Sequence, residues 1–227
     1  MNEPVKPRSW KQNPEAVKAD ILAAARQEFA EHGLSRARVQ DIAARTKTSK
    51  RMVFYYFKDK EALYQAVLED AYAEVRQGEL ELKVDDLAPD VALQRLIQFT
   101  FDHHRANPDF IRLVMIENIH GGRHMQDMAE MPHMNKPAVL LLDRICKAGV
   151  AAGLFREDVH PLRIHWQISA ASVFNVANRI TFSYNFGTEF YTDTGQDALR
   201  AEVTRTIMLS VLKPGTPIPQ TPCSDRA

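Results

Sequence analysis

Cysteine is scarce in this 227-residue chain, and long apolar runs are missing. Cys146 falls on an apolar helix face and Cys223 in a polar tail, so the two do not suggest a disulfide framework. Such cysteine usage fits the reducing environment of the cytoplasm. No stretch approaches the ~18 consecutive apolar residues of a membrane helix, and no signal-peptide pattern opens the chain. We therefore expect a cytoplasmic protein with no membrane partner.

Sequence motifs of common enzyme classes are also missing. There is no glycine-rich phosphate loop after a strand, no HExxH and no GxSxG. No useful length of alternating polar and apolar residues indicates a strand, and helical periodicity runs through most of the chain. These absences favour an all-α protein that is not an enzyme and needs no cofactor. A helical enzyme whose site leaves no motif is the remaining alternative.

Charge is distributed unevenly, although the chain as a whole has 29 basic and 29 acidic residues. Residues 1–60 contain 13 Lys and Arg against 7 Asp and Glu, whereas the remainder contains 16 against 22. A basic first quarter followed by an acidic remainder indicates a nucleic-acid-binding module joined to a domain that avoids nucleic acid. The alternative is a solvated charged face that binds nothing.

The basic region contains the pattern of a helix-turn-helix. Apolar residues at helical spacing predict a short helix over Val39–Thr46, and Lys47-Thr48 forms a tight turn. Ser49 is a good N-cap for a second helix over Lys50–Phe57. A recognition helix enters the major groove of double-stranded DNA with its N-terminal residues against the bases. Two cations at that end oppose the helix dipole, which only an anionic partner would offset.

We predict that this motif contacts bases through Lys50 and Arg51 and phosphates through the hydroxyls of Tyr55 and Tyr56. The expected DNA-binding residues are Arg38, Lys47, Thr48, Ser49, Lys50, Arg51, Tyr55, Tyr56 and Lys60.

Residues 16–64 carry further positions in register with this motif. They are Ile21, Leu22, Ala24, Ala25, Phe29, Ala30 and Gly33 in and after an opening helix, Val39, Asp41, Ile42 and Ala43, the run Phe54-Tyr55-Tyr56-Phe57, and Lys60-Glu61-Ala62-Leu63. In these positions the segment resembles the DNA-binding domain of tetracycline-repressor-type (TetR-family) transcriptional regulators. It departs from the family in three places: Lys47 replaces the usual turn glycine, Arg38 a capping threonine, and Arg51 a small residue.

The resemblance implies an all-α fold with an N-terminal three-helix DNA-binding domain and a larger C-terminal helical domain for ligand binding and dimerisation. We expect a flexible basic arm at 1–14, the DNA-binding domain at 15–60, the ligand-binding and dimerisation domain at 61–212, and a disordered tail at 213–227. The arm either contacts DNA or is simply disordered. The implied function is that of a homodimeric repressor released from a near-palindromic operator by a small organic effector.

Prolines and apolar periodicity divide the C-terminal part into helices. The expected helices are Ala16–His32 before the motif and Lys60–Glu79, Asp90–Ala106, Pro108–His120, Pro137–Ala152, Pro161–Tyr184 and Gly195–Lys213 after it. The segment Leu162–Tyr184 is apolar nearly all round and must be buried on every side. We therefore expect a dimer interface that includes Phe174, Ile207 and Val211. The alternative is the interior helix of a large monomer.

Polar residues embedded in apolar helices mark the expected effector pocket, because a buried polar group requires a partner. The candidates, with apolar walls included, are His103, Met115, Asn118, Trp166, Asn175, Asn178, Arg179 and Phe182, together with Glu117 and Ser172. Ser172, Asn175 and Arg179 fall on one face of a continuous helix. A polar seam at the dimer interface is an equal alternative for these three.

Histidines and methionines alternate between residues 120 and 134. His120, His124 and His133 are interleaved with Met125, Met128, Met131 and Met134, and imidazole with thioether is a ligand set that suits Cu(I). The spacing matches no structural zinc pattern. A metal-responsive regulator of the same fold is the alternative function, while packing by methionine is the favoured interpretation of the segment.

Overall fold

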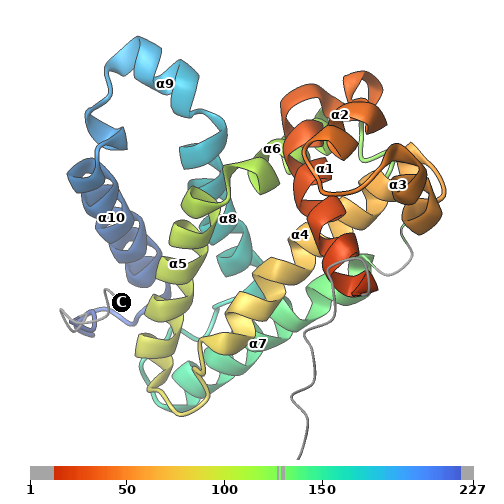
Figure 1. The fold of residues 1–227 in the computed structure, drawn as a ribbon. Coiled ribbons are helices and arrows are strands. Elements are labelled where there is room, and N and C mark those ends of the chain that lie inside the picture. The colour runs from red at the N-terminus through yellow and green to blue at the C-terminus, as the bar shows by residue number, and fades with distance from the viewer. Residues whose placement is uncertain (1–12, 127, 129–130, 221–227) are drawn as a thin grey trace, which may run out of the picture. The chain divides into compact units, whose positions relative to one another are not determined.

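The computed structural model describes residues 13–126, 128 and 131–220. It divides into two compact units (Figure 1). Unit 1 contains residues up to Ala73 and the segment Arg112–Met131, and unit 2 contains Glu74–Ile111 and residues from Pro132 onward. The described part of the chain contains ten α-helices and no strand longer than a single bridge, so the expected all-α fold is confirmed. No described helix has the length and apolar character to cross a membrane.

Unit 1 is built on three whole helices and parts of two others. They are α1 (Pro14–Arg36), α2 (Val39–Ala44), α3 (Lys50–Phe57), α4 (Lys60–Glu81) as far as Ala73, and α6 (Pro108–Ile119) from Arg112. Helix α1 turns sharply at Gly33, where φ is 66° and ψ is 169°, conformations that glycine adopts without a steric cost. The helix therefore ends regular winding close to His32, where the sequence predicted its end.

The core of unit 1 gathers apolar side chains from each of these helices. Phe29 of α1 and Tyr64 of α4 meet edge to face, with ring centroids 5.0 Å apart, and Ile42 of α2 and Val53 of α3 are buried in the same unit. Tyr64 donates a hydrogen bond of 2.8 Å to Glu117 Oε1. That bond fixes the second half of α6 within unit 1.

Unit 2 contains the remaining helices. They are the end of α4, α5 (Pro89–Ala106), the start of α6, α7 (Met131–Ala151), α8 (Pro161–Ala177), α9 (Arg179–Phe186), the 3-10 turn η2 (Glu189–Tyr191) and α10 (Asp193–Val211). Helices α5, α8 and α10 pack together (Figure 1). Their buried side chains form one core with those of α7, which includes Leu93, Ile97, Leu142, Ile168 and Met208. Pro108 and Pro161 are the first residues of α6 and α8, as the sequence predicted, and α5 begins at Pro89, one residue before the predicted start.

Most helix ends lie within one or two residues of the sequence-based expectation, but the start of α7 and the continuity of α8 differ more. Helix α7 begins at Met131, six residues before Pro137, which therefore lies inside it. Its second residue is Pro132, another proline that suits a first turn. The expected single helix over Pro161–Tyr184 is broken at Asn178, where φ is −99° and ψ is 4°. These angles lie in the bridge region, outside the range that continues a helix.

The C-terminal segment also corrects an expectation. Residues 213–220 were expected to begin a disordered tail, but they pack on unit 2. Gln94 Nε2 donates to the carbonyl of Pro219 at 3.0 Å, Lys213 N donates to the carbonyl of Leu154, and Ile218 packs against the core. At the other end, Asn13 caps α1 by accepting a bond from the amide of Ala16. Residues 1–12 and the tail from 221, with Cys223, lie outside the described residues, whereas Cys146 is buried.

Candidate functional site

Helix α3 separates a buried face from an exposed one. Val53 and Phe57 are buried in unit 1, whereas Lys50, Arg51 and Tyr55 face solvent, with Tyr55 76% exposed. Ser49 Oγ accepts a bond from the amide of Met52, which confirms the predicted N-cap. The solvent side of the helix therefore presents the cations of Lys50 and Arg51 in its first turn and the phenol of Tyr55 one turn later.

Lys50 is held in place by an aromatic neighbour. Its Nζ lies 5.8 Å from the ring centroid of Phe54, four residues later on the same helix face and itself partly exposed. This distance falls within the range of a cation–π contact. Tyr55 and Tyr56 pack edge to face with centroids 5.3 Å apart. Sequence reasoning missed Phe54 as a support for Lys50, although the i, i+4 spacing was visible.

The turn between α2 and α3 closes without glycine. Among the described non-glycine residues, only Lys58 and Lys83 have positive φ, so Lys47 avoids the left-handed region. Thr46 Oγ1 donates to the carbonyl of Ala43 and accepts from the amide of Thr48, while Asp20 Oδ2 of α1 accepts from the amide of Lys47. These side-chain hydrogen bonds stabilise the turn in the absence of a glycine. The side chain of Lys47 is exposed.

Helix α2 is fixed to α1 by carboxylates. The side chain of Glu28 is buried and accepts a bond from the amide of Arg38 at 3.3 Å, and its Oε2 lies 3.2 Å from Arg45 NH2. Arg45 also bonds Glu31 at 2.9 Å, and this hydrogen bond lowers the pKa of Glu31. Arg38 has no side-chain cap function, as expected, and its guanidinium is on an exposed residue. These contacts hold α2 and the start of the turn in position for α3.

Lys60 is placed differently from the prediction. Its ammonium donates to the carbonyls of Leu34, Ser35 and Ala37 at 2.6, 3.4 and 3.1 Å. An ammonium has three protons, and these three carbonyls lie beyond the end of regular winding in α1. Lys60 therefore ties α4 to the end of α1, and a phosphate contact is not the role that this geometry supports. The exposed members of the predicted set are Arg38, Lys47, Ser49, Lys50, Arg51 and Tyr55, while Thr48 and Tyr56 are half-buried.

The predicted effector residues do not converge on one site. Met115 and Asn118 belong to unit 1, both are exposed, and Asn118 Nδ2 bonds the carbonyl of Val114 in its own helix. Glu117 is buried in unit 1, where it accepts bonds from Tyr64 and from the amide of His124 and faces His124 Nδ1 at 2.9 Å. These residues stabilise unit 1 and do not line a pocket of the central helices.

Asn175 and Gln196 form a buried pair within unit 2. Each amide donates to the other's oxygen, at 2.9 and 3.0 Å, and Gln196 also donates to the carbonyl of Phe190. Ser172 Oγ bonds the carbonyl of Ile168 in its own helix. Both expectations for Asn175, a pocket residue and a seam between subunits, are therefore replaced by a tie between α8 and α10.

Arg179 and Phe182 lie beyond the break at Asn178, on α9. Arg179 is exposed with its guanidinium 5.7 Å from the ring centroid of Tyr191, and Phe182 contacts the rings of Phe174, Phe186, Phe190 and Tyr191. The face that Ser172, Asn175 and Arg179 were expected to share does not exist, because the helix ends between them. His103 is half-buried in unit 2, with its ring centroid 5.5 Å from that of Phe99.

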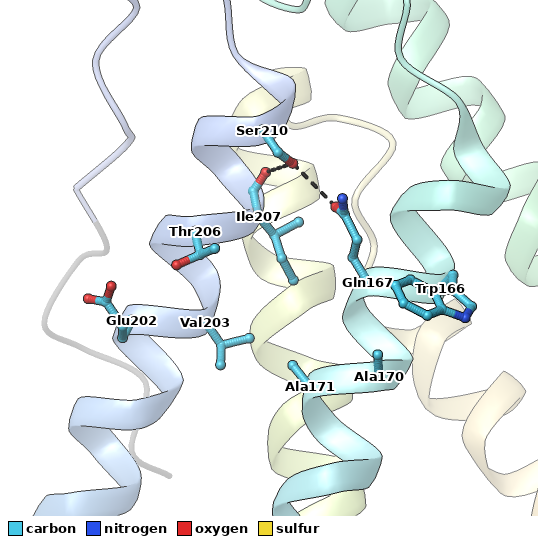
Figure 2. Close-up of a pocket in the computed structure, with 9 residues that line it drawn as sticks. All are labelled: Trp166, Gln167, Ala170, Ala171, Glu202, Val203, Thr206, Ile207 and Ser210. Carbon is cyan, nitrogen blue, oxygen red and sulfur yellow. Dashed lines mark hydrogen bonds between the residues drawn. The ribbon is translucent and has the colours of Figure 1, made fainter.

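A groove of about 350 Å³ lies between α8 and α10 (Figure 2). Its sides are formed by Trp166, Gln167, Ala170, Ala171, Glu202, Val203, Thr206, Ile207 and Ser210. Ser210 Oγ donates to Gln167 Oε1 across it at 3.2 Å. Trp166 is 71% exposed, and Phe174 on the same helix is half exposed. Ile207 and Val211, predicted at a dimer interface, are buried in the core of unit 2, and Ile207 also lines the groove.

Among the described residues, the histidines of the histidine- and methionine-rich segment belong to no group of three His, Cys, Asp or Glu side chains close enough to hold a metal ion. His120 Nδ1 faces the carbonyl of Ile116 at 2.8 Å, His124 Nδ1 faces Glu117, and Met128 is buried. The side chains of Met131 and Met134 lie outside the described residues. In the part of the chain that the structure describes, Glu28, Glu31 and His32 are close enough to hold a cation. The guanidinium of Arg45 already forms ion pairs with both Glu28 and Glu31.

Segments of both units match known protein families. Residues 21–67 match the family described as "Bacterial regulatory proteins, tetR family", and residues 89–207 match "Tetracyclin repressor-like, C-terminal domain". The HTH-type transcriptional repressor NicS of Pseudomonas putida is 34% identical over 172 residues, covering 76% of this chain and 81% of that protein. The HTH-type transcriptional repressor SCO4008 of Streptomyces coelicolor is 35% identical over 53% of this chain and 57% of its own length. The crystal structure of the putative transcriptional regulator SCO4942 from Streptomyces coelicolor superposes with a TM-score of 0.65 at 25% identity, covering 88% of this chain and 99% of that one.

Proposed function

Because this chain belongs to the tetracycline-repressor-type (TetR) family of bacterial transcriptional regulators, which are not enzymes, we propose that it is a repressor released from DNA by a small organic effector. It binds a near-palindromic operator as a homodimer. The observation that carries this proposal is the exposed face of α3, where Lys50, Arg51 and Tyr55 have solvent-facing positions on a helix anchored by Val53 and Phe57.

The exposed face of α3 fits the major groove of DNA. Lys50 and Arg51 occupy the first turn, the part of a recognition helix that meets base edges, and a guanidinium reads guanine through two hydrogen bonds. Arg38, Lys47 and Tyr55 supply further exposed donors for phosphates. Binding is then steeply dependent on salt, because each phosphate that a cation neutralises releases counterions.

Dimerisation is supported by an apolar row on α8. Leu162, Trp166, Ala170 and Phe174 recur every four residues on the solvent side of this helix, beside the groove in Figure 2. Leu209 of α10 is exposed as well. A contiguous exposed apolar patch of this kind marks an interaction surface. A second copy of the chain buries it isologously, and two identical reading heads then match a two-fold symmetric operator.

Effector control requires a ligand that binds the DNA-free conformation more tightly than the DNA-bound one. We place the effector in unit 2. Helices α4 and α6 each contain residues of both units, so a shift of either helix in unit 2 reaches unit 1 along a continuous backbone. A coupling of about 1–3 kcal/mol weakens operator binding roughly 5–150-fold.

Sequencing of genomic fragments that the purified protein retains tests the DNA-binding part. We expect enrichment of a near-palindromic sequence, and Arg51→Ala should relax its base preference by about 1–3 kcal/mol per lost contact. Arg163→Ala is the matched control, since Arg163 is an exposed arginine of unit 2. If Arg51→Ala kept the full preference of the unaltered protein, α3 would not be the reading helix.

Sedimentation analysis tests the dimer. Trp166→Glu places a charge in the apolar row and should shift the protein toward monomer. The control is Leu140→Glu, a charge placed at an exposed leucine of α7. A stable monomer for the unaltered chain at micromolar concentration, or an unaltered dimer for Trp166→Glu, would contradict the proposed interface.

A further inference from the structure

A buried ion pair lies on the part of α4 that belongs to unit 2. Arg76 NH1 donates to Glu79 Oε2 at 2.7 Å, one helical turn apart. Glu79 is 7% exposed, and burial raises its pKa to about 7 in spite of the opposing effect of Arg76. A carboxyl with such a pKa accepts a proton near neutral pH at little cost in free energy. The ion pair is therefore easier to open than one between ordinary acids and bases.

Two imidazoles of other helices in unit 2, His104 of α5 and His165 of α8, lie close enough to Arg76 for its charge to lower their pKa values. His104 of α5 is 6% exposed, and its Nδ1 is buried without a hydrogen-bond partner among the described residues. Burial is the largest cause that lowers the pKa of His104 to about 4, and the charges of His103 on the same helix, Arg76 and His165 act in the same direction. His104 is therefore neutral at physiological pH, with one ring nitrogen unused.

Aromatic rings complete the surroundings of the imidazoles. Phe99 lies 5.5 Å from His103, and Phe110 at the start of α6 lies 5.8 Å from His104, measured between ring centroids. Phe99 also packs on α4 at Gly78, where its ring leaves no room for a Cβ. Apolar rings around a few polar groups are the usual make-up of a small-molecule site.

The unused nitrogen needs an explanation, because a buried polar group without a partner is costly and native proteins contain few of them. We propose that Arg76 and His104 receive the carboxylate of a small organic acid, and that Glu79 is the resident counter-ion that this acid replaces. The inference rests on the proposed function and names the chemical class of its effector. Arg76 offers the charge, and the Nδ1–H tautomer of His104 offers a second hydrogen bond.

Binding by this route takes up a proton. Before binding, the positive charge of Arg76 is balanced by ionised Glu79. After binding it is balanced by the ligand carboxylate, and Glu79 takes a proton from solvent as it leaves the pair. No bond of the ligand is broken and no redox partner is required. Uptake approaches one proton per ligand above the pKa of Glu79 and decreases below it. Affinity should therefore fall by up to about tenfold per pH unit above pH 7 and level off below it.

Calorimetry on the full-length protein with benzoate as the probe tests the proposal. Benzamide, of nearly the same shape but uncharged, is the matched control ligand. Titrations at pH 8 in phosphate and in Tris, which differ in ionisation enthalpy, measure the protons taken up. We expect benzoate to bind with uptake close to one proton and benzamide to bind more weakly with none. Equal binding of the two, or benzoate binding without proton uptake, or no benzoate binding at millimolar concentration, overturns the proposal.

Variants separate the ligand site from a merely structural ion pair. Glu79→Gln keeps the side-chain shape but removes the competing charge, so benzoate should bind at least tenfold more tightly at pH 8 and without proton uptake. Arg76→Met should lose benzoate binding. Arg105→Gln is the control, because Arg105 is paired with the exposed Asp193. If Glu79→Gln binds benzoate like the unaltered protein, Glu79 is not the counter-ion that the ligand replaces.

Operator binding by the same samples without ligand distinguishes a failure of the carboxylate site from a failure of the proposed repressor function. Glu79→Gln should bind the operator like the unaltered protein. Operator release by neutral ligands alone would sink the carboxylate site and leave the effector-controlled repressor intact. Absence of operator binding by the unaltered protein would sink the proposed function, whereas the benzoate titrations would still report on Arg76, Glu79 and His104.

Discussion

Helix α3 in unit 1 and helix α8 in unit 2 treat their polar side chains in opposite ways. Lys50, Arg51 and Tyr55 of α3 extend into solvent, whereas Ser172 and Asn175 of α8 are buried and bonded, to a backbone carbonyl and to Gln196. On α8 a row of apolar side chains that includes Trp166 is exposed, as is the charged Arg163. Polar groups that point outward from an anchored helix are available to a charged partner. Polar groups that are buried and paired stabilise the fold instead. The exposed apolar row of α8 is the surface that we propose a second copy of the chain covers.

The largest effect is expected inside unit 1, at Glu117. Glu117→Ala removes the acceptor of Tyr64, of the amide of His124 and of its ring. Buried donors left unpaired in this way should cost about 3–5 kcal/mol of unfolding free energy. Urea denaturation measures it. Glu61→Ala, an exposed carboxyl of α4, should change stability by less than about 0.5 kcal/mol. A loss below that of the control would show that Glu117 is not the tie that the geometry indicates.

Two lysines of unit 1, Lys50 and Lys60, lie ten residues apart but have opposite roles. Lys60→Met leaves three carbonyls near the end of α1 without their ammonium, and we expect a stability loss of about 2 kcal/mol. Lys50→Met should leave stability within about 0.5 kcal/mol while weakening operator binding. Denaturation and DNA titration on both variants give the four values. Unchanged stability for Lys60→Met would return Lys60 to the phosphate-binding set.

In unit 2, the buried amide of Asn175 is expected to contribute to stability through Gln196. Asn175→Leu leaves Gln196 buried without its reciprocal partner and should cost about 1–3 kcal/mol. The double variant Asn175→Leu with Gln196→Leu should lose less than the sum of the single losses, because both partners are then apolar. Denaturation of the three variants measures the coupling. Additive losses would mean that the two amides do not depend on each other.

Sequence alone predicted α3 well because everything that defines it is local. Ser49, the two buried apolar residues and the cations lie within nine residues, so capping and periodicity suffice. The role of Lys60 depends on carbonyls 23 to 26 residues earlier, and that of Asn175 on an amide 21 residues later. Such partners become neighbours only when the helices pack. The helix break at Asn178 could not be predicted either, because no glycine or proline lies at that position. The predicted effector residues were dispersed for the same reason.

The smallest expected effect is a cancellation in the pH dependence of stability. Glu79 has a folded-state pKa of about 7 against an ordinary 4.5, so its contribution to stability falls as pH rises from about 4.5 to 7. His104 has a folded-state pKa of about 4 against 6.5, so its contribution rises from about pH 4 to 6.5. Arg76, His103 and His165 are the other charged or titratable groups that act on these two.

Between about pH 4.5 and 6.5 the two slopes therefore oppose each other. Each is at most about 1.4 kcal/mol per pH unit, and the slope that this cluster adds to the unaltered protein should be close to zero. Glu79→Gln removes the falling slope, so its stability should rise with pH relative to the unaltered protein. His104→Phe removes the rising slope, so its stability should fall by comparison. Urea denaturation at several pH values measures both differences. Parallel pH profiles for all three proteins would mean that neither group titrates as its burial dictates, and would remove the physical basis for a displaceable Glu79.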